Sequence, residues 1–224
     1  TILLLLLDDH WFGVPVLAVS FLVFLYSLGR GNLDEQVDGY RDDLMRDDLQ
    51  AAYHDAAEFN PAGETGVAED WRQLHQETVE AISYRYFERY FAVMFWFVIA
   101  GAPGALLYRL MVLHQDMALD SEEEKQRVGS YLVLMEWLPS RLMGLSLAFV
   151  GNFTACLNYW RGSLLTISTT TLQIMAGYVT TALQSGTVSE GSVERVSEVE
   201  DIKALFSRAM IFSLCMVAFL VMLI

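Results

Sequence analysis

The sequence predicts an all-α, multi-pass helical membrane protein with one broken membrane helix and an acidic helical lobe in water. Three observations lead to this prediction. Hydrophobic residues make up 54% of the 224 residues, yet the formal net charge is −14. The apolar residues are concentrated in long runs, and the acidic residues lie between those runs. One run, from Arg85 to Leu110, is interrupted midway by the residues GAPG. This pattern is typical of one membrane domain with one polar lobe.

Residues 1–28 are predicted to form N-terminal membrane helices. The opening TILLLLL is too short to cross a bilayer and meets the polar stretch DDHW abruptly, so we expect residues to be missing after Leu7. It lacks a basic n-region and a small-residue cleavage site, which favours a membrane helix over a cleavable signal. Trp11 to Leu28 is the first complete membrane segment, with Trp11 and Tyr26 near its ends, where such rings favour the membrane interface.

Residues 29–88 are predicted to form the acidic helical lobe. A polar turn from Gly29 to Asn32 ends the first segment, and Asn32 can cap the helix that follows. Between Leu33 and Phe59 the apolar residues recur mostly every three to five positions, which indicates an amphipathic helix, whole or broken in two. The stretch NPAGETG after Phe59 is a loop.

Four aspartates crowd one section of this lobe, namely Asp42, Asp43, Asp47 and Asp48. They are interpreted as a solvated acidic face. A divalent-metal site is the alternative, because Mg²⁺ sites need only one or two carboxylates together with substrate phosphates.

Charged residues precede the broken run. Glu77, Glu80, Tyr84 and Glu88 follow one another at helical spacings of three and four, so they share one face of a helix. Arg85 and Arg89 lie on an adjoining face, and Arg85 can pair with Glu88. Two interpretations stay open: these charges anchor the helix at the membrane interface, or they form a binding site at headgroup level.

The run from Tyr90 to Val112 is long enough to cross a hydrocarbon core of roughly 30 Å. Pro103 and its flanking glycines interrupt it and leave carbonyl groups that lipid cannot satisfy. We therefore expect the break to lie inside protein or against a polar cavity, either as a structural kink or as part of a binding site. Arg109, late in the run, either reaches out to the interface or faces a carboxylate in a polar interior.

A second motif lies between Tyr131 and Phe149. Glu136 and Arg141 stand in an apolar setting with Trp137 and Pro139 between them, and ionisable groups in such settings are candidates for functional sites. A kink at Pro139 could bring the two charges face to face. Gly144 and Gly151 would allow close helix approach.

Residues 89–224 are assigned to a helical membrane domain. Within it, the threonine-rich stretch from Ser163 to Leu183 predicts a packed or interfacial helix, and the uncharged stretch from Ala209 to the end predicts a C-terminal transmembrane helix that faces lipid.

Several functions are disfavoured by composition. Nucleic-acid binding needs clustered Lys and Arg, which this acidic chain lacks. Cys156 and Cys215 lie in apolar contexts without metal-ligand spacing, and the four histidines share none either. No P-loop, dinucleotide fingerprint or catalytic triad is visible in the sequence. We therefore predict no catalytic residue, no metal and no cofactor.

The motifs FAVMFWFVIAGAPGALLYRL and LMEWLPSRLMGLSLAFVG resemble the AmpE family of Gram-negative inner-membrane proteins. That family is similar in turn to the adenosylcobinamide-phosphate synthases of the CobD/CbiB superfamily. The segment LGRGNLDEQVDGYRDDLMRDDLQAA also resembles this superfamily, so the resemblance covers about half of the chain. Synthases carry a Glu-Asn pair and an Asp ahead of the motif FW, whereas this chain has Tyr84, Arg85 and Glu88 there. It also lacks their Asn-Thr-x-Asp element.

These departures favour the AmpE branch over an enzyme. The resemblance implies a regulatory or signalling protein of the bacterial inner membrane, linked to β-lactamase induction and cell-wall recycling, with its lobe in the cytoplasm. We predict that it binds an anionic or lipid-like ligand, or a partner, at a polar intramembrane site. The alternatives are an Mg²⁺- and ATP-dependent condensing enzyme and an accessory subunit of a larger membrane complex. The predicted partners are membrane lipid and either a second copy or another membrane protein. The predicted ligand-binding residues are Arg85, Glu88, Arg109, Glu136, Trp137 and Arg141.

Overall fold

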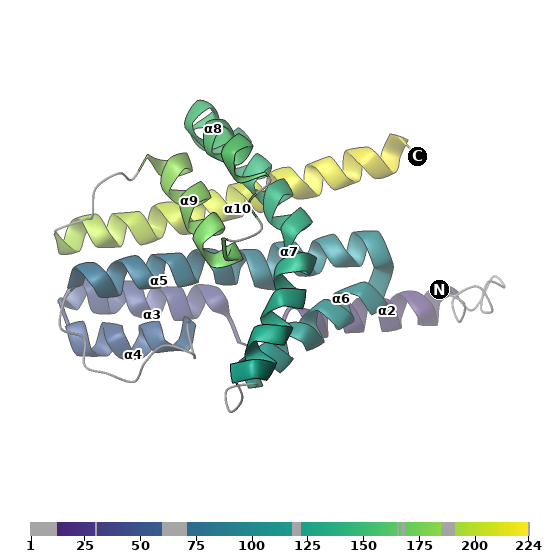
Figure 1. Cartoon of the computed structure of the whole chain (residues 1–224), viewed down its shortest axis with the longest axis horizontal. Helices are drawn as coiled ribbons and strands as arrows, with labels where there is room; N and C mark the ends of the chain where they lie inside the picture. Colours follow the sequence, from purple (N-terminus) through teal and green to yellow (C-terminus); the bar gives the residue numbers. More distant parts are fainter. Residues whose placement is uncertain are drawn as a thin grey trace.

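The structure is a computed structural model, which describes residues 13–29, 31–59, 71–117, 122–164, 166, 169–184 and 191–223 (Figure 1). Within these ranges the ordered elements are helices, and there is no strand. The predictions for the opening apolar residues, for Trp11 and for the loop after Phe59 lie outside the described residues.

The helices follow one another along the chain, with a π-helical segment, η1, joining α5 to α6. Their bounds are α2 Gly13–Ser27, α3 Leu33–Arg46, α4 Leu49–Phe59, α5 Trp71–Tyr86, η1 Phe87–Ala92, α6 Val93–Met117, α7 Glu122–Val150, α8 Phe153–Ser163, α9 Thr171–Leu183 and α10 Ser192–Leu223.

The turn and cap predicted after the first segment are confirmed. Gly29 and Gly31 both have φ 82°, a left-handed conformation that glycine adopts without strain. The Asn32 side chain then accepts a hydrogen bond from the backbone N–H of Asp34 at 3.1 Å, which caps α3. The amphipathic stretch that follows is broken in two at Asp47, whose φ of 53° ends α3 before α4 begins.

The acidic lobe packs around the first half of α5. Tyr40 of α3 lies 3.0 Å from Nδ1 of His75 in α5, and Nε2 of His75 lies 3.2 Å from a carboxylate oxygen of Glu198 in α10. Burial raises the pKa of the Tyr40 hydroxyl well above its usual range, so this hydroxyl stays protonated and can donate. Lys203 of α10 adds an ion pair to Asp38 at 2.6 Å. The start of α10 is therefore fastened to the lobe.

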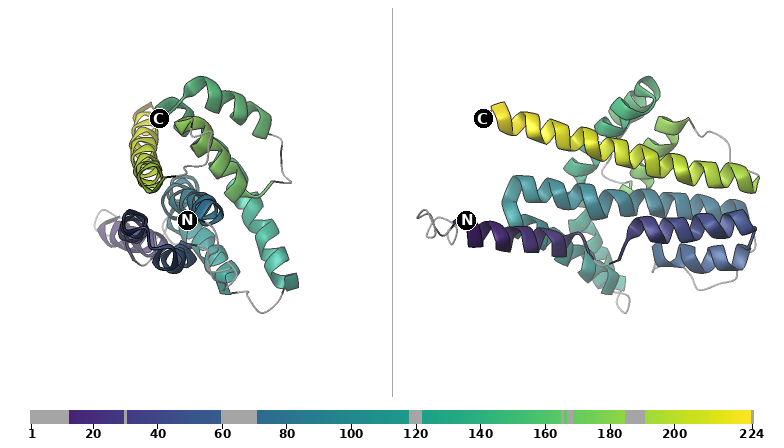
Figure 2. Two further views of the ribbon diagram at one scale, coloured as in Figure 1. Left: turned by 90° about the vertical axis from the view of Figure 1, so that its left-hand side faces the viewer. Right: turned by 180° about the vertical axis from the view of Figure 1, so that it is seen from behind.

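Helices α2, α5 and α10 run along the long axis of the molecule, with the lobe at one end and the apolar ends of α2 and α10 at the other (Figure 1). In the left view of Figure 2, which looks along this axis, α2 and α10 are seen nearly end-on, whereas α7 is seen from the side. Helix α7 therefore crosses the others at a steep angle.

The broken run does not continue as a straight helix. Gly101 has φ 69° and ψ −162°, which is far from helical geometry, and beyond it α6 turns back (Figures 1 and 2). The expected position of the break, inside protein or against a polar cavity, is met only in part, because Gly104 is buried whereas Pro103 is exposed. Ile99 is 65% exposed and Val98 44% exposed. The break forms the tip of a hairpin, because a positive φ reverses the chain where a kink would only bend it.

Three helical stretches are long and apolar enough to cross a membrane, namely Trp71–Asp116, Arg127–Val150 and Ser192–Phe219, and Pro15–Ser27 is a shorter apolar helix. The outward surface of these helices carries many large apolar side chains, including Leu22, Leu134 and Phe219. The predicted fold class, an all-α membrane protein of multi-pass type, is confirmed. The predicted domain limits stay a prediction, and η1 continues the helix across the limit expected at residue 88.

The two glycines predicted to allow close helix approach do so. A Cβ built on Gly144 of α7 would lie 2.4 to 2.7 Å from ring atoms of Tyr178 in α9. A Cβ on Gly151 would lie 2.8 Å from the backbone oxygen of Ala182. Both distances are well below van der Waals contact, so α9 can sit where it does only because these side chains are absent.

We expect Gly144→Ala to destabilise the protein by about 1–3 kcal/mol, because the added methyl group forces α7 and α9 apart. The melting temperature in detergent, followed by circular dichroism, should fall by about 2–4 °C for each kcal/mol lost. Gly162→Ala is the matched control, since no atom lies within 4 Å of a Cβ there. A loss of similar size in both variants would contradict the packing explanation.

Candidate functional site

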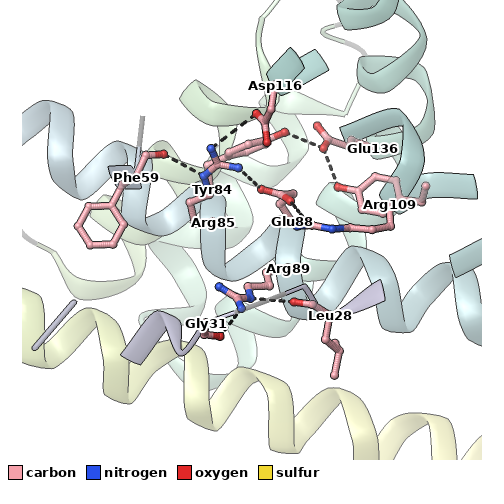
Figure 3. A network of polar contacts seen from close by, with 11 residues as sticks. Leu28, Gly31, Phe59, Tyr84, Arg85, Glu88, Arg89, Arg109, Asp116 and Glu136 are labelled. Atoms are coloured by element: carbon pink, nitrogen blue, oxygen red, sulfur yellow. Dashed lines mark hydrogen bonds and ion pairs between the residues drawn. The ribbon is translucent and has the colours of Figure 1, made fainter. Parts of the chain in front are cut away.

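A buried carboxylate occupies the centre of the polar network shown in Figure 3. Glu88, on η1, is 1% exposed. Its Oε2 accepts a hydrogen bond from Nη1 of Arg85 at 2.7 Å, and its Oε1 accepts one from Nη1 of Arg109 at 3.0 Å. The predicted pairing of Arg85 with Glu88 is confirmed. The sequence leaves two positions open for Arg109, at the membrane interface or facing a carboxylate, and the structure shows the second.

These contacts join the two arms of the hairpin at its base. Glu88 lies before the break and Arg109 after it, 21 positions apart. In a straight α-helix that separation would be about 31 Å, at 1.5 Å per residue. The observed 3.0 Å between their side chains is possible only because the chain reverses at Gly101.

A second buried carboxylate lies on α7, across the base of the hairpin. Glu136 is 1% exposed. Its Oε1 accepts hydrogen bonds from the hydroxyls of Tyr84 at 2.9 Å and of Tyr108 at 2.8 Å. Tyr84 precedes the break and Tyr108 follows it, so Glu136 also bridges the two arms. None of the described basic side chains forms an ion pair with Glu136.

Other contacts tie the network to neighbouring elements. Arg85 donates from Nε to the backbone oxygen of Phe59, the last residue of α4, at 2.8 Å. Its Nη2 lies 3.8 Å from Asp116 near the end of α6, the longest ion pair in the network. Arg89 donates to the backbone oxygens of Leu28, at 2.8 Å, and of Gly31. The network thus connects the lobe, the turn after α2 and the hairpin.

The turn after α2 is also in direct contact with Arg109. A Cβ built on Gly29 would lie 2.8 Å from Nη2 of Arg109, so glycine allows the guanidinium to approach the turn closely. The left-handed φ of 82° at this position favours the same residue.

Arg141 does not join this network. It donates to the backbone oxygens of Ser163 and Thr166, both at 2.8 Å, and to the Ser140 hydroxyl at 3.0 Å. It thereby holds the end of α8 against α7. The expected pairing of Arg141 with Glu136 or Arg109 is wrong. Helix α7 continues through Pro139, so residues five positions apart point about 140° away from each other.

Trp137 lies near Arg141. The Arg141 guanidinium lies 5.8 Å from the centre of the Trp137 ring, within range of a cation–π contact. Of the six predicted site residues, the structure brings four together, Arg85, Glu88, Arg109 and Glu136. The ligand-binding role of all six stays a prediction.

Tyr108 also belongs to the site, although it is not among the residues predicted from the sequence. Its hydroxyl is the shortest contact that Glu136 makes with a tyrosine, and the residue is fully buried. The available signal was its place directly before Arg109 in the motif, together with the high cost of an unpartnered hydroxyl in an apolar run.

The acidic section of the lobe forms no evident metal site. Within the described ranges no group of three or more His, Cys, Asp or Glu side chains is arranged to hold a metal ion. Asp43, one of the four crowded aspartates, is buried and faces Asp55 of α4. Burial and the charge of Asp43 raise the pKa of the Asp55 carboxyl, which eases their repulsion.

Comparisons with known proteins agree on one superfamily. The model of a family described as "Regulatory signalling modulator protein AmpE" matches residues 1–224. Protein AmpE of Shigella flexneri is 26% identical over 181 residues, covering 78% of this chain and 64% of that protein. Cobalamin biosynthesis protein CobD of Stutzerimonas stutzeri is 30% identical over 158 residues, covering 66% of this chain and 50% of that protein. No solved structure matches. The chain thus spans about half to just under two thirds of the curated relatives it matches.

We expect Glu88→Gln to destabilise the protein on the order of 3–5 kcal/mol, because the guanidinium groups of Arg85 and Arg109 would lose their shared buried counter-charge. Thermal unfolding in detergent measures the loss.

Glu77→Gln on the exposed face of α5 is the control. Among the described residues, its carboxylate accepts only an exposed hydrogen bond from Gln73, so we expect a change within about 0.5 kcal/mol. If the two variants unfold at the same temperature, the Glu88 network does not hold the fold together.

Proposed function

The chain belongs to the AmpE family, and we propose that it acts as a regulatory signalling protein of the bacterial inner membrane, linked to β-lactamase induction and cell-wall recycling. The family match over residues 1–224 supports the regulatory class. The helices long enough to cross a membrane support a membrane location. The link to β-lactamase comes from the family resemblance.

We propose that the signal is received at the network around Glu88. One observation carries this assignment: two guanidinium groups, from Arg85 and Arg109, share a single buried carboxylate. The contact of Arg85 with Asp116 is long, at 3.8 Å. An anionic group of a lipid-like ligand or of a partner protein could compete with Asp116 for Arg85, since guanidinium binds carboxylates and phosphates in the same planar geometry.

Binding there would be transmitted through contacts already in place. Arg85 also holds the end of α4 through the Phe59 carbonyl, and Arg89 holds the turn after α2. A ligand that draws Arg85 outward would loosen the end of α4, and the lobe would change position relative to the membrane helices. This coupling requires that the ligand bind one arrangement of Arg85 better than the other.

An enzyme is the second candidate, because two cobalamin biosynthesis proteins named CobD match the chain at 30% and 28% identity. Such an activity would be an Mg²⁺- and ATP-dependent condensation. The carboxylates of Glu77, Glu80 and Glu88, which share one helix face, would lie near the nucleotide. Purified protein should then bind or hydrolyse ATP in the presence of Mg²⁺. If the wild-type protein neither binds nor hydrolyses ATP, the enzyme is excluded.

The third candidate is an accessory subunit of a larger membrane complex, or a homo-oligomer. Purification in native detergent would recover a partner in constant stoichiometry for a subunit, and the chain alone for a solitary sensor.

For the regulatory proposal, we expect Arg109→Ala and Glu136→Gln to change β-lactamase induction several-fold in cells that lack their own family member and carry this chain instead. A β-lactam below its inhibitory concentration serves as the inducer, and enzyme activity is the readout. Arg161→Ala, at an exposed position of α8, should behave as wild type.

Immunoblots of the membrane fraction show whether each variant accumulates. Normal induction by variants present at wild-type levels would contradict the proposal. Equal loss of folded protein in both network variants would leave only a structural role for the network.

A further inference from the structure

We propose that residues 88–109 form a re-entrant hairpin, which enters the bilayer from the side of the acidic lobe, turns at Gly101 and returns to the same side. This inference rests on geometry and is independent of the proposed signalling role. It assigns the bilayer hydrocarbon as the partner of the exposed apolar tip, and it places the polar network at the level where the hairpin enters.

Two sets of polar contacts close the base of the hairpin. The ion pair between Glu88 and Arg109 joins the charged residues at the two ends of the apolar run at 3.0 Å. Glu136 bridges the arms again through Tyr84 and Tyr108. A helix that crosses the membrane once places its two ends on opposite sides, about 30 Å apart. Two independent polar clamps hold these ends together instead.

The first arm of the hairpin is long enough to reach deep into a bilayer. From Glu88 to Gly101 there are 13 residues of helix, which extend about 20 Å at 1.5 Å per residue. The tip thus enters the far half of a hydrocarbon core of about 30 Å.

The neighbouring helices α2 and α10 extend in the same direction as the hairpin. The apolar ends of α2 and α10 project toward the same end of the molecule as the hairpin tip (Figure 1). Phe24 of α2 packs on Phe97 of the first arm, with ring centroids 4.7 Å apart. The hairpin therefore has a neighbour that extends in the same direction from the polar network.

Helix α7 is oriented across α2 and α10. Seen along the long axis it lies across the view, whereas α2 and α10 are nearly end-on (Figure 2). A flat bilayer crossed along α2 and α10 cannot also be crossed along α7. We therefore place α7 along the membrane surface at the hairpin base. Its outward apolar stripe consists of Tyr131, Leu134, Leu138 and Leu142.

Lipid explains the composition of the exposed tip. Val98 and Ile99 are apolar and exposed on the first arm, and Leu107 and Leu110 are exposed on the second. Charged residues lie only near the base of both arms, at Arg85, Glu88 and Arg89 before the run and from Arg109 onward after it. A protein surface in water would leave these apolar groups unfavourably hydrated, whereas hydrocarbon accommodates them.

Cysteine labelling in membrane vesicles of both orientations tests the proposal. The full chain carries Cys156→Ala and Cys215→Ala, and one cysteine is then introduced at a time. Gln76→Cys lies before the hairpin, His114→Cys after it and Ile99→Cys near its tip. All three positions are exposed, and Glu194→Cys at the start of α10 marks the side of the lobe. The probe is a maleimide that cannot cross the membrane, and Glu77→Cys replaces Gln76→Cys if that variant fails to accumulate.

We expect Gln76→Cys and His114→Cys to react in the same vesicle orientation as Glu194→Cys. Ile99→Cys should be protected from that side, and either react only with a lipid-soluble maleimide or react from the far side. Labelling of Gln76→Cys and His114→Cys from opposite sides would overturn the proposal, because the run would then cross the bilayer. Labelling of Ile99→Cys from the lobe side would overturn it as well, because the tip would then not be inserted.

Discussion

The ion pair between Glu88 and Arg109 is the interaction on which the rest of the structure depends, because it joins two parts of the chain that a continuous helix would hold about 31 Å apart. A charge at such a position is costly to bury alone. The two charges can therefore pair only if the chain reverses between them. The left-handed φ of Gly101 provides that reversal. The glycine at position 101, its left-handed φ and the pairing of Glu88 with Arg109 are thus mutually consistent.

Other elements are positioned through the same contacts. The turn after α2 fits against Arg109 because Gly29 has no side chain, and Arg89 fixes that turn through backbone carbonyls. Arg85 reaches the end of α4, and Glu136 adds α7. Every one of these contacts is made by a side chain within or beside the hairpin. The lobe and the membrane helices are thus coupled through a small polar region, which is the physical basis for proposing that a signal passes there.

Much of this could be predicted from the sequence, and the remainder could not, for identifiable reasons. Capping by Asn32, the close approach at Gly144 and the pairing of Arg85 with Glu88 follow from local spacing. The reversal at Gly101 could not be distinguished from a kink, because hydropathy measures apolar length and carries no information on direction. The partners of Glu136 depend on how α7 packs on α5 and α6, and those of Arg141 on how the end of α8 packs on α7, which are tertiary properties. Spacing along α7 alone suggested a pair that its continuous helix prevents.

The distance between the two arms is the most direct test of the chain reversal at Gly101. Spin labels at positions 76 and 114, in the full chain reconstituted in lipid nanodiscs, would be measured by double electron–electron resonance. A straight helix would separate these positions by about 57 Å, at 1.5 Å per residue. If the chain reverses at Gly101, we expect a distance below half of that value, because the second arm returns toward the base. A distribution centred near the straight-helix value would contradict the reversal, and with it the clamp between Glu88 and Arg109.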